Sequence, residues 1–422
     1  MISTGPGTSS CMPCRRAVCL GRRAMSAEAL EHELDALLGE SIDSVRARQA
    51  GALEQLLGGV GHPFALFGAG NLGRKVQALM KGQGLVPLAF IDNNPALWGT
   101  SIDGIEVLSP QQLAARHDGE LPGIITTIWY GEASDSMAQR LEPLRRLGFN
   151  KIALFGHLAW RFPQGFLPHY CLDLPEKVLA DAEGVRQAFR LLADEESRRL
   201  FVAHVRWRLF LDYDVLPAAS PRQIYFDGHF TTFREDEVLY DLGAFDGDTA
   251  QGYLDSGRGY REVHCFEPVA DNFSRLRARL ADLHRSGLNA HRLALGDVAG
   301  EVLIEADHGP SSRVGHGEQS VPMTTLDDFA AAHAPASFIK IDIEGFEPQC
   351  LAGGRRLISE RHPVIAVSVY HEQDHLWRIL LQLHSYHDGY RFSLCPHVSD
   401  GWDLVLYAVP TDRVPPHSSD EQ

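Results

Sequence analysis

Two stretches of the chain share one pattern, in which a short apolar run leads into a glycine-rich turn and then into a helix. The first stretch is Phe64–Phe67 with Gly68-Ala-Gly-Asn-Leu-Gly73, and the second is Val238–Leu242 with Gly243-Ala-Phe-Asp-Gly247. Each stretch opens a series of strand-length apolar runs that alternate with helical patterns. Such alternation is typical of parallel sheets covered by helices. The sequence therefore predicts an α/β fold with one sheet in each half of the chain.

Length and charge restrict the classes of partner. A chain of 422 residues suits two domains, because compact domains commonly hold about 100–200 residues. Lys and Arg number 39 against 55 Asp and Glu, so the net charge is −16. An acidic chain lacks the extended basic surface that binds nucleic acid or anionic membranes. No apolar run reaches the roughly 18–20 residues that cross a bilayer, and residues 1–25 lack the apolar segment of a secretory signal. We therefore expect a cytoplasmic protein.

Composition and periodicity divide the chain into six segments. We expect a flexible leader at 1–25, a helical segment at 26–60, a Rossmann-like binding domain at 61–160, a helical connector at 161–235, a second α/β domain at 236–410 and a tail at 411–422. Leucines at helical spacing in 26–60 predict amphipathic helices that pack on the first domain or form a homodimer contact. Met25 is an alternative start, and the tail, rich in Pro and Ser, is predicted to be frayed.

The seven cysteines point to a reducing compartment more than to a metal site. Cys11, Cys14 and Cys19 have the spacing of a partial metal site, but no fourth ligand stands nearby. The other four cysteines are scattered and are expected to be buried thiols. We predict no metal here.

Acidic residues surround the second glycine turn, at Asp241, Asp246 and Asp248. Gly243 would allow the backbone to approach a ligand closely. The three carboxylates would repel a pyrophosphate but suit a cationic sulfonium. The next apolar run ends at Glu267, 26 residues after Asp241, where a carboxylate can accept both ribose hydroxyls. These features favour S-adenosylmethionine over NAD. The alternative is that the acids only cap strand and helix ends.

Five further motifs follow in order. They are Phe-Glu-Pro at 266–268, Ala-Leu-Gly-Asp at 294–297, Thr-Thr-Leu-Asp-Asp-Phe at 324–329, Lys-Ile-Asp-Ile-Glu-Gly-Phe-Glu at 340–347, and Tyr-His at 370–371 with Trp-Asp-Leu-Val-Leu-Tyr at 402–407. With the glycine turn, they resemble the FkbM family of methyltransferases over about residues 222–410. The resemblance implies a class I methyltransferase fold, with a seven-stranded sheet whose final strand is antiparallel. It also implies S-adenosylmethionine-dependent O-methylation, often of a sugar or natural product.

Site residues follow from these motifs by position. The resemblance implies that the cofactor is bound by Asp241, Gly243, Gly247, Asp248, Thr249, Glu267, Pro268, Leu295, Gly296, Asp297 and Asp342. Methyl transfer to oxygen is an in-line displacement that also removes a proton. His371 is the candidate base, because neutral imidazole suits pH near 7, and Asp342 and Glu344 would orient the acceptor or act as base. The alternative roles are structural, a core histidine and a helix cap. No metal is predicted at these residues, because a second carboxylate pair is missing.

The first glycine turn matches Gly-x-Gly-x-x-Gly through Gly68, Gly70 and Gly73, and Asp92 follows 19 residues later. This pattern predicts a second site, for a nucleotide or nucleotide-sugar. The alternative is a turn required only for strand–helix packing. Trp129 and Tyr130 would stack on a ligand there or pack in the core. Two rival functions stay open at this point, an NAD(P)-dependent nucleotide-sugar oxidoreductase and a non-catalytic binding protein.

Overall fold

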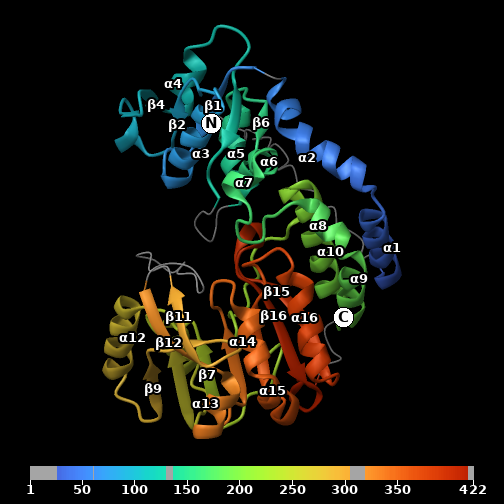
Figure 1. Ribbon diagram of the computed structural model, residues 1–422, viewed down its shortest axis with the longest axis vertical. Coiled ribbons are helices and arrows are strands. Elements are labelled where there is room, and N and C mark those ends of the chain that lie inside the picture. Colours follow the sequence, from blue (N-terminus) through green and yellow to red (C-terminus); the bar gives the residue numbers. More distant parts are fainter. Residues whose placement is uncertain (1–25, 60, 130–135, 305–318, 417–422) are drawn as a thin grey trace, which may run out of the picture.

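The computed structural model describes residues 26–59, 61–129, 136–304 and 319–416. The predicted leader at 1–25, with Cys11, Cys14 and Cys19, and Tyr130 lie outside the described residues. Figure 1 shows two α/β units, the first in blue and teal and the second in yellow to red, with green helices beside both. None of the helices that the structure describes is long and apolar enough to cross a membrane.

The first unit is a six-stranded sheet with the order β3-β4-β2-β1-β5-β6. Its strands are β1 (Phe64–Phe67), β2 (Phe90–Ile91), β3 (Ser101–Ile102), β4 (Ile105–Leu108), β5 (Gly123–Thr126) and β6 (Ile152–Ala153). All neighbouring pairs are parallel except β3 and β4. Helices α3 (Asn71–Gly82), α4 (Pro110–Ala115) and α5 (Met137–Arg146) connect the strands. Of the residues between 85 and 91, only those of β2 join the sheet, and Val86 and Leu88 are exposed.

Helices before and after this unit join it to the second unit. They are α1 (Ala27–Leu38), α2 (Ile42–Leu57), α6 (Phe155–Arg161), α7 (Pro163–Phe166), α8 (Pro175–Ala180), α9 (Ala182–Leu191) and α10 (Glu195–Phe210). α2 packs on α6 and α8, whereas α1 packs on α9 and α10. α8 and α9 are separated at Asp181, whose carboxylate accepts a hydrogen bond of 2.6 Å from the indole N–H of Trp377.

The second unit is a seven-stranded sheet with the order β15-β16-β14-β13-β7-β8-β9. Its strands are β7 (Val238–Leu242), β8 (Glu262–Phe266), β9 (Leu288–His291), β13 (Phe338–Ile341), β14 (Val364–Ser368), β15 (Tyr390–Pro396) and β16 (Leu404–Pro410). Only β16 is antiparallel to its neighbours. β7, β13 and β14 are buried along their whole length, as expected for parallel strands between two helical layers. The predicted class I methyltransferase fold is confirmed.

Helices α11 (Asp248–Asp255), α12 (Ala270–Asp282), α13 (Leu326–Ala332), α14 (Glu347–Gly353), α15 (Arg355–Arg361) and α16 (His375–Tyr386) cover this sheet. α9 packs on α16, and α10 packs on β15. The four described cysteines are buried free thiols, as predicted.

A small sheet of β10 (Ala294–Leu295), β11 (Gly300–Ile304) and β12 (Gln319–Thr324) was not predicted. β12 alternates buried and exposed positions, with Val321 and Met323 buried, so no continuous apolar run marks it. β9 ends at His291 and β10 begins at Ala294, so residues 292–293 belong to no strand.

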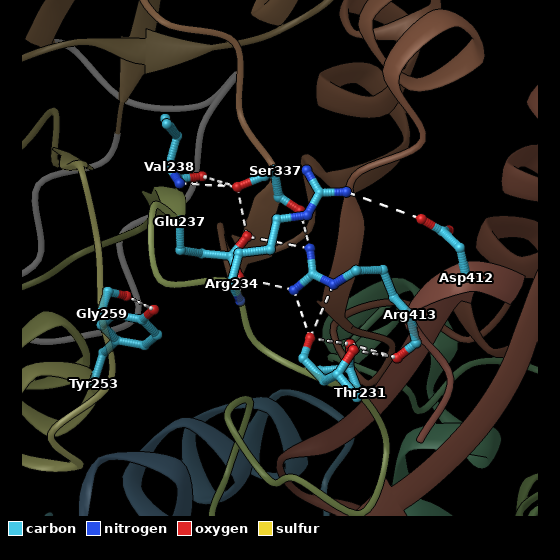
Figure 2. Close-up of polar contacts among 10 residues, drawn as sticks. Thr231, Arg234, Glu237, Val238, Tyr253, Gly259, Ser337, Asp412 and Arg413 are labelled. Carbon is cyan, nitrogen blue, oxygen red and sulfur yellow. Dashed lines mark hydrogen bonds and ion pairs between the residues drawn. The ribbon is translucent and has the colours of Figure 1, made fainter. Parts of the chain in front are cut away.

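The predicted fraying of the tail is wrong for its first residues, because a buried ion pair holds them. Figure 2 shows Arg413 directed at Glu237, and the two side chains are 2.8 Å apart while only 4% and 0% exposed. Arg413 also donates two hydrogen bonds to the carbonyl of Thr232, and the hydroxyl of Ser337 donates to Glu237. These contacts join the segment after β16 to the start of β7 and the loop before β13.

We predict that Arg413→Met lowers the free energy of unfolding by about 3–5 kcal/mol, because it leaves the Glu237 carboxylate buried without its cation. The control is Arg378→Met in the same domain, which removes the exposed pair of Arg378 with Asp374 and should cost less than about 1 kcal/mol. Urea unfolding of the full chain measures both values. Equal, small losses for the two variants would contradict the role given to the buried pair.

Candidate active site

A cavity of about 320 Å³ opens at the carboxyl ends of β7, β8 and β13. β13 and β8 flank β7 on opposite sides, so the cavity lies at the point where the strand order reverses. Ligands of open α/β sheets bind at such a point. The volume is at the lower end of the range for small-molecule sites, about 300–1,000 Å³.

Eight of the predicted site residues line this cavity. They are Gly243, Asp248, Thr249, Glu267, Pro268, Leu295, Asp342 and Glu344. Five others, Asp241, Gly247, Gly296, Asp297 and His371, are not part of its lining. The structure therefore brings the predicted motifs together, with some residues in the cavity wall and others behind it. The role of each residue stays a prediction.

Gly243 is required where the loops after β7 and β13 meet. Its φ is +76°, and a Cβ atom there would lie 1.8 Å from the carbonyl oxygen of Asp342. A larger residue would push the two loops apart. The close approach places the glycine turn beside Asp342, at the centre of the cavity wall.

Asp241 supports the cavity from behind. Its carboxylate lies 3.1 Å from Lys340 Nζ, and both side chains are buried. Lys340 Nζ also donates to the carbonyls of Gly243 (2.7 Å) and Leu242 (3.2 Å). Burial lowers the pKa of Lys340, but the charges of Asp241 and Asp342 outweigh it and raise the pKa above its ordinary value. The charged lysine therefore holds the glycine turn in place.

Glu267 follows β8 and faces the cavity. Its two oxygens accept the backbone N–H groups of Phe245 (3.1 Å) and Val269 (2.9 Å), and Asn272 Nδ2 lies 3.4 Å away. Burial raises the pKa of Glu267. The carboxylate is thus held in one orientation at the expected ribose position.

His371 lies behind the cavity among three carboxylates. Its Nδ1 is 2.8 Å from Glu347 Oε1, and its Nε2 is 3.4 Å from Asp342 Oδ1 and 3.7 Å from Glu344 Oε2. Burial lowers the pKa of His371, but the charges of Glu347, Glu344 and Asp342 outweigh it and raise the pKa to about 10. The expectation of a neutral imidazole near pH 7 therefore does not fit the surroundings of this histidine.

Four residues in or beside the cavity were not among the predicted site residues, namely Tyr225, Lys340, Glu347 and Asp403. The Tyr225 hydroxyl donates a hydrogen bond of 2.9 Å to Asp342 Oδ2. Asp403 lines the cavity, and burial together with the charge of Asp342 raises its pKa to about 6. Lys340, Glu347 and Asp403 lie within the sequence motifs, which could have indicated them as site residues. Nothing in the sequence around Tyr225 indicated a site.

The first glycine turn has the geometry of a tight β–α connection. Gly68 has φ +114°, and a Cβ atom on Gly73 would lie 2.0 Å from the carbonyl oxygen of Gly68. Gly70 directly precedes α3. Asp92 lies beside the turn as predicted, and its oxygens accept the N–H groups of Ala69 and Asn94, each at 2.8 Å. These bonds stabilise the turn, and nucleotide binding there stays a prediction.

Trp129 packs against aromatic rings from other parts of the chain. Its ring contacts those of Phe155, Trp207 and Trp402 at centroid distances of 5.7, 6.3 and 6.2 Å. Trp402 belongs to the second unit, so this cluster is part of the contact between the two units. The packing alternative predicted for Trp129 is the one that these contacts support.

Comparison with known families decides the class of the second unit. The family model described as "Methyltransferase FkbM domain" matches residues 241–393. Residues 241–393 are a methyltransferase FkbM domain. The chain is therefore a methyltransferase, as its motifs predicted.

One solved structure shares the fold over most of the chain. Methyltransferase FkbM from Methylobacillus flagellatus KT is 20% identical, with a TM-score of 0.72 over 91% of this chain and 100% of that chain. The shared fold thus extends beyond the FkbM domain. Precorrin-6y C5,15-methyltransferase from Geobacter metallireducens GS-15 is 11% identical over 46% of this chain and 94% of that chain, with a TM-score of 0.28. UDP-D-quinovosamine 4-dehydrogenase from Vibrio fischeri is 21% identical over 22% of this chain and 75% of that chain, with a TM-score of 0.18. These two are too distant to inform function, and no curated protein matches the chain.

We predict that Glu267→Gln weakens binding of S-adenosylmethionine at least about tenfold, because a hydrogen bond to a charged group contributes about 1.5–3 kcal/mol. Calorimetric titration of the full chain measures the affinity. The control is Glu262→Gln at the opposite end of β8, which should bind as wild type does. An affinity of Glu267→Gln within twofold of wild type would contradict the ribose assignment.

Proposed function

We propose that this methyltransferase transfers a methyl group from S-adenosylmethionine to a hydroxyl of a sugar, glycan or secondary-metabolite acceptor. The observation that carries the proposal is the acidic cavity of the FkbM domain, whose wall includes Glu267. Its carboxylates can balance the charge of a cationic sulfonium and can accept hydrogen bonds from the hydroxyl groups of an acceptor. Neither ligand needs phosphate-binding groups in the cavity.

The residues of the cavity fit this cofactor. The glycine turn leaves room beside the backbone, Glu267 can accept the ribose hydroxyls, and Asp248 and Asp342 can balance the positive charges of the sulfonium and ammonium groups. S-adenosylmethionine supplies the methyl group. Lys340, the buried cation nearby, is paired with Asp241 and does not cancel the negative charge of the cavity wall.

A second cavity supports a polar acceptor. It has a volume of about 590 Å³ and shares Glu344 with the first cavity. Its wall combines α8 of the connector, the loops after β13 and β14, and the start of α16, through residues such as Lys177, Glu372 and Arg378. Carboxylate, ammonium and guanidinium groups can all bind hydroxyl oxygens or hydrogens. An acceptor bound there would present a hydroxyl to the cofactor cavity beside Glu344.

The carboxylates of the cavity are the groups that we propose as acceptors of the hydroxyl proton. The oxygen–methyl bond forms as the sulfur–methyl bond breaks, and the hydroxyl proton has to pass to a base within reach. Asp342, Glu344 and Asp403 all line the cofactor cavity, whereas His371 lies behind it. We propose these three carboxylates as the groups that orient the acceptor and accept its proton.

The N-terminal unit would position the substrate. We propose that the turn of Gly68, Gly70 and Gly73, with Asp92, binds a nucleotide or a nucleotide-linked sugar. The strand–turn–helix geometry and the adjacent carboxylate support this role. The cytoplasmic location and the homodimer remain predictions.

We predict that the full chain transfers labelled methyl groups to a member of a panel of hydroxylated acceptors, including nucleotide-linked sugars. Gly243→Ala should lower both cofactor affinity and turnover more than tenfold, because the added Cβ meets the Asp342 carbonyl. Gly252→Ala in α11 is the matched control, since nothing lies within 4 Å of its Cβ position, and it should act as wild type. Thermal melting confirms that both variants fold.

Two results would contradict this function. Cofactor binding without transfer to any acceptor would favour a non-catalytic binding protein. Binding of NADH without binding of S-adenosylmethionine would favour the oxidoreductase.

A further inference from the structure

Tyr225 reaches the cofactor cavity from the segment between α10 and β7. It precedes the matched residues 241–393, lines the cavity together with Ile224, and is only 5% exposed. We propose that Tyr225 is a positioning residue that holds the Asp342 carboxylate toward the sulfonium of the cofactor. This inference rests on the proposed function, in which Asp342 balances the sulfonium charge.

One hydrogen bond carries the inference. The Tyr225 hydroxyl donates to Asp342 Oδ2 at 2.9 Å, while Asp342 Oδ1 lies 3.4 Å from His371 Nε2. A rotation of the carboxylate plane would break both contacts. Hydrogen bonds to a charged acceptor are about twice as strong as those between neutral groups. The carboxylate therefore has one preferred orientation.

The Tyr225 hydroxyl keeps its proton and acts as a donor. Burial raises the pKa of Tyr225 well above its ordinary value, and the charges of Asp342 and Asp403 raise it further. A neutral phenol has a single O–H group to donate. Asp342 is the carboxylate that receives it.

The backbone of Tyr225 is held in a conformation that few side chains adopt. Its φ is +63°, and its N–H donates to the Tyr407 hydroxyl on β16 at 2.9 Å. Positive φ is uncommon outside glycine, and it persists where the surroundings enforce it, often at active sites. Ten non-glycine residues in the described ranges have a positive φ, and four of them line this cavity, namely Tyr225, Phe245, Glu344 and Asp403.

The ring of Tyr225 contacts the buried ion pair of the site. Lys340 Nζ lies 5.4 Å from the ring centroid, within the distance of a cation–π contact, and pairs with Asp241. Tyr225 thus contacts Lys340 through its ring and Asp342 through its hydroxyl. Removal of the hydroxyl alone would leave the ring and the backbone bond to Tyr407 in place, so Tyr225→Phe isolates the bond to Asp342.

The alternative is that this hydrogen bond only stabilises the fold. S-adenosylmethionine and S-adenosylhomocysteine distinguish the two roles, because they differ only in the methyl group and positive charge on sulfur. Loss of a purely structural bond would weaken both ligands alike. Loss of a bond that directs a carboxylate toward the sulfur would weaken the charged ligand alone.

Calorimetric titration of the full chain with each of the two ligands tests the inference. In Tyr225→Phe, we expect the affinity for S-adenosylmethionine to fall at least about fivefold, because the orienting bond to a charged group is lost. The affinity for S-adenosylhomocysteine should stay within twofold of wild type.

Tyr253→Phe is the matched control. Its buried hydroxyl donates to the Gly259 carbonyl at 2.8 Å, as Figure 2 shows, and Tyr253 is not part of the cavity lining. Both affinities should equal those of wild type. Thermal melting confirms that both tyrosine variants fold.

Asp342→Asn gives a second measurement. It removes the charge that Tyr225 orients, so it should lower the affinity for S-adenosylmethionine by itself. Addition of Tyr225→Phe to Asp342→Asn should lower it no further, because the two residues act as one unit. Additive losses in the double variant would overturn the inference.

The same titrations separate this inference from the proposed function. A wild-type ratio of the two affinities in Tyr225→Phe would overturn the positioning role alone, with cofactor binding intact. Failure of the wild-type chain to bind either ligand would overturn the proposed function and this inference with it.

Discussion

The buried ion pair of Lys340 with Asp241 organises the active site, because it links the ends of the two central strands β13 and β7. Lys340 Nζ also holds the carbonyls of Leu242 and Gly243, so the glycine turn cannot move independently of β13. Gly243 then lies directly against the carbonyl of Asp342. The cavity exists where these two loops meet and β8 contributes Glu267. A methyltransferase needs this rigidity, since in-line transfer depends on the relative placement of donor and acceptor.

The acidic residues at this site differ in whether their negative charge is balanced by a neighbouring group. Asp241 is neutralised by Lys340, Glu267 is held by backbone N–H groups, and Glu347 is paired with His371. Asp342 and Asp403 remain in the cavity wall, where they suit a sulfonium and can take up a proton. The same −16 charge that argues against nucleic acid therefore also favours a cationic cofactor.

Local patterns predicted most of the fold and the position of the glycine turn after β7. β7, β13 and β14 are mostly apolar, and Glu267 follows a strand, so their positions follow from sequence alone. Features that depend on distant contacts were not predictable. The bond of Tyr225 to Asp342 joins residues 117 positions apart, and the charge of His371 depends on Glu347 at the start of α14. The ordering of Arg413 depends likewise on Glu237, which is far away in sequence.

A crystal structure of the full chain with S-adenosylhomocysteine tests the central claim most directly. The account predicts that the ribose hydroxyls lie within hydrogen-bond distance of Glu267, with the sulfur beside Asp342. A ligand bound instead at the turn of Gly68 to Gly73, or absent from the cavity at saturating concentration, would contradict it.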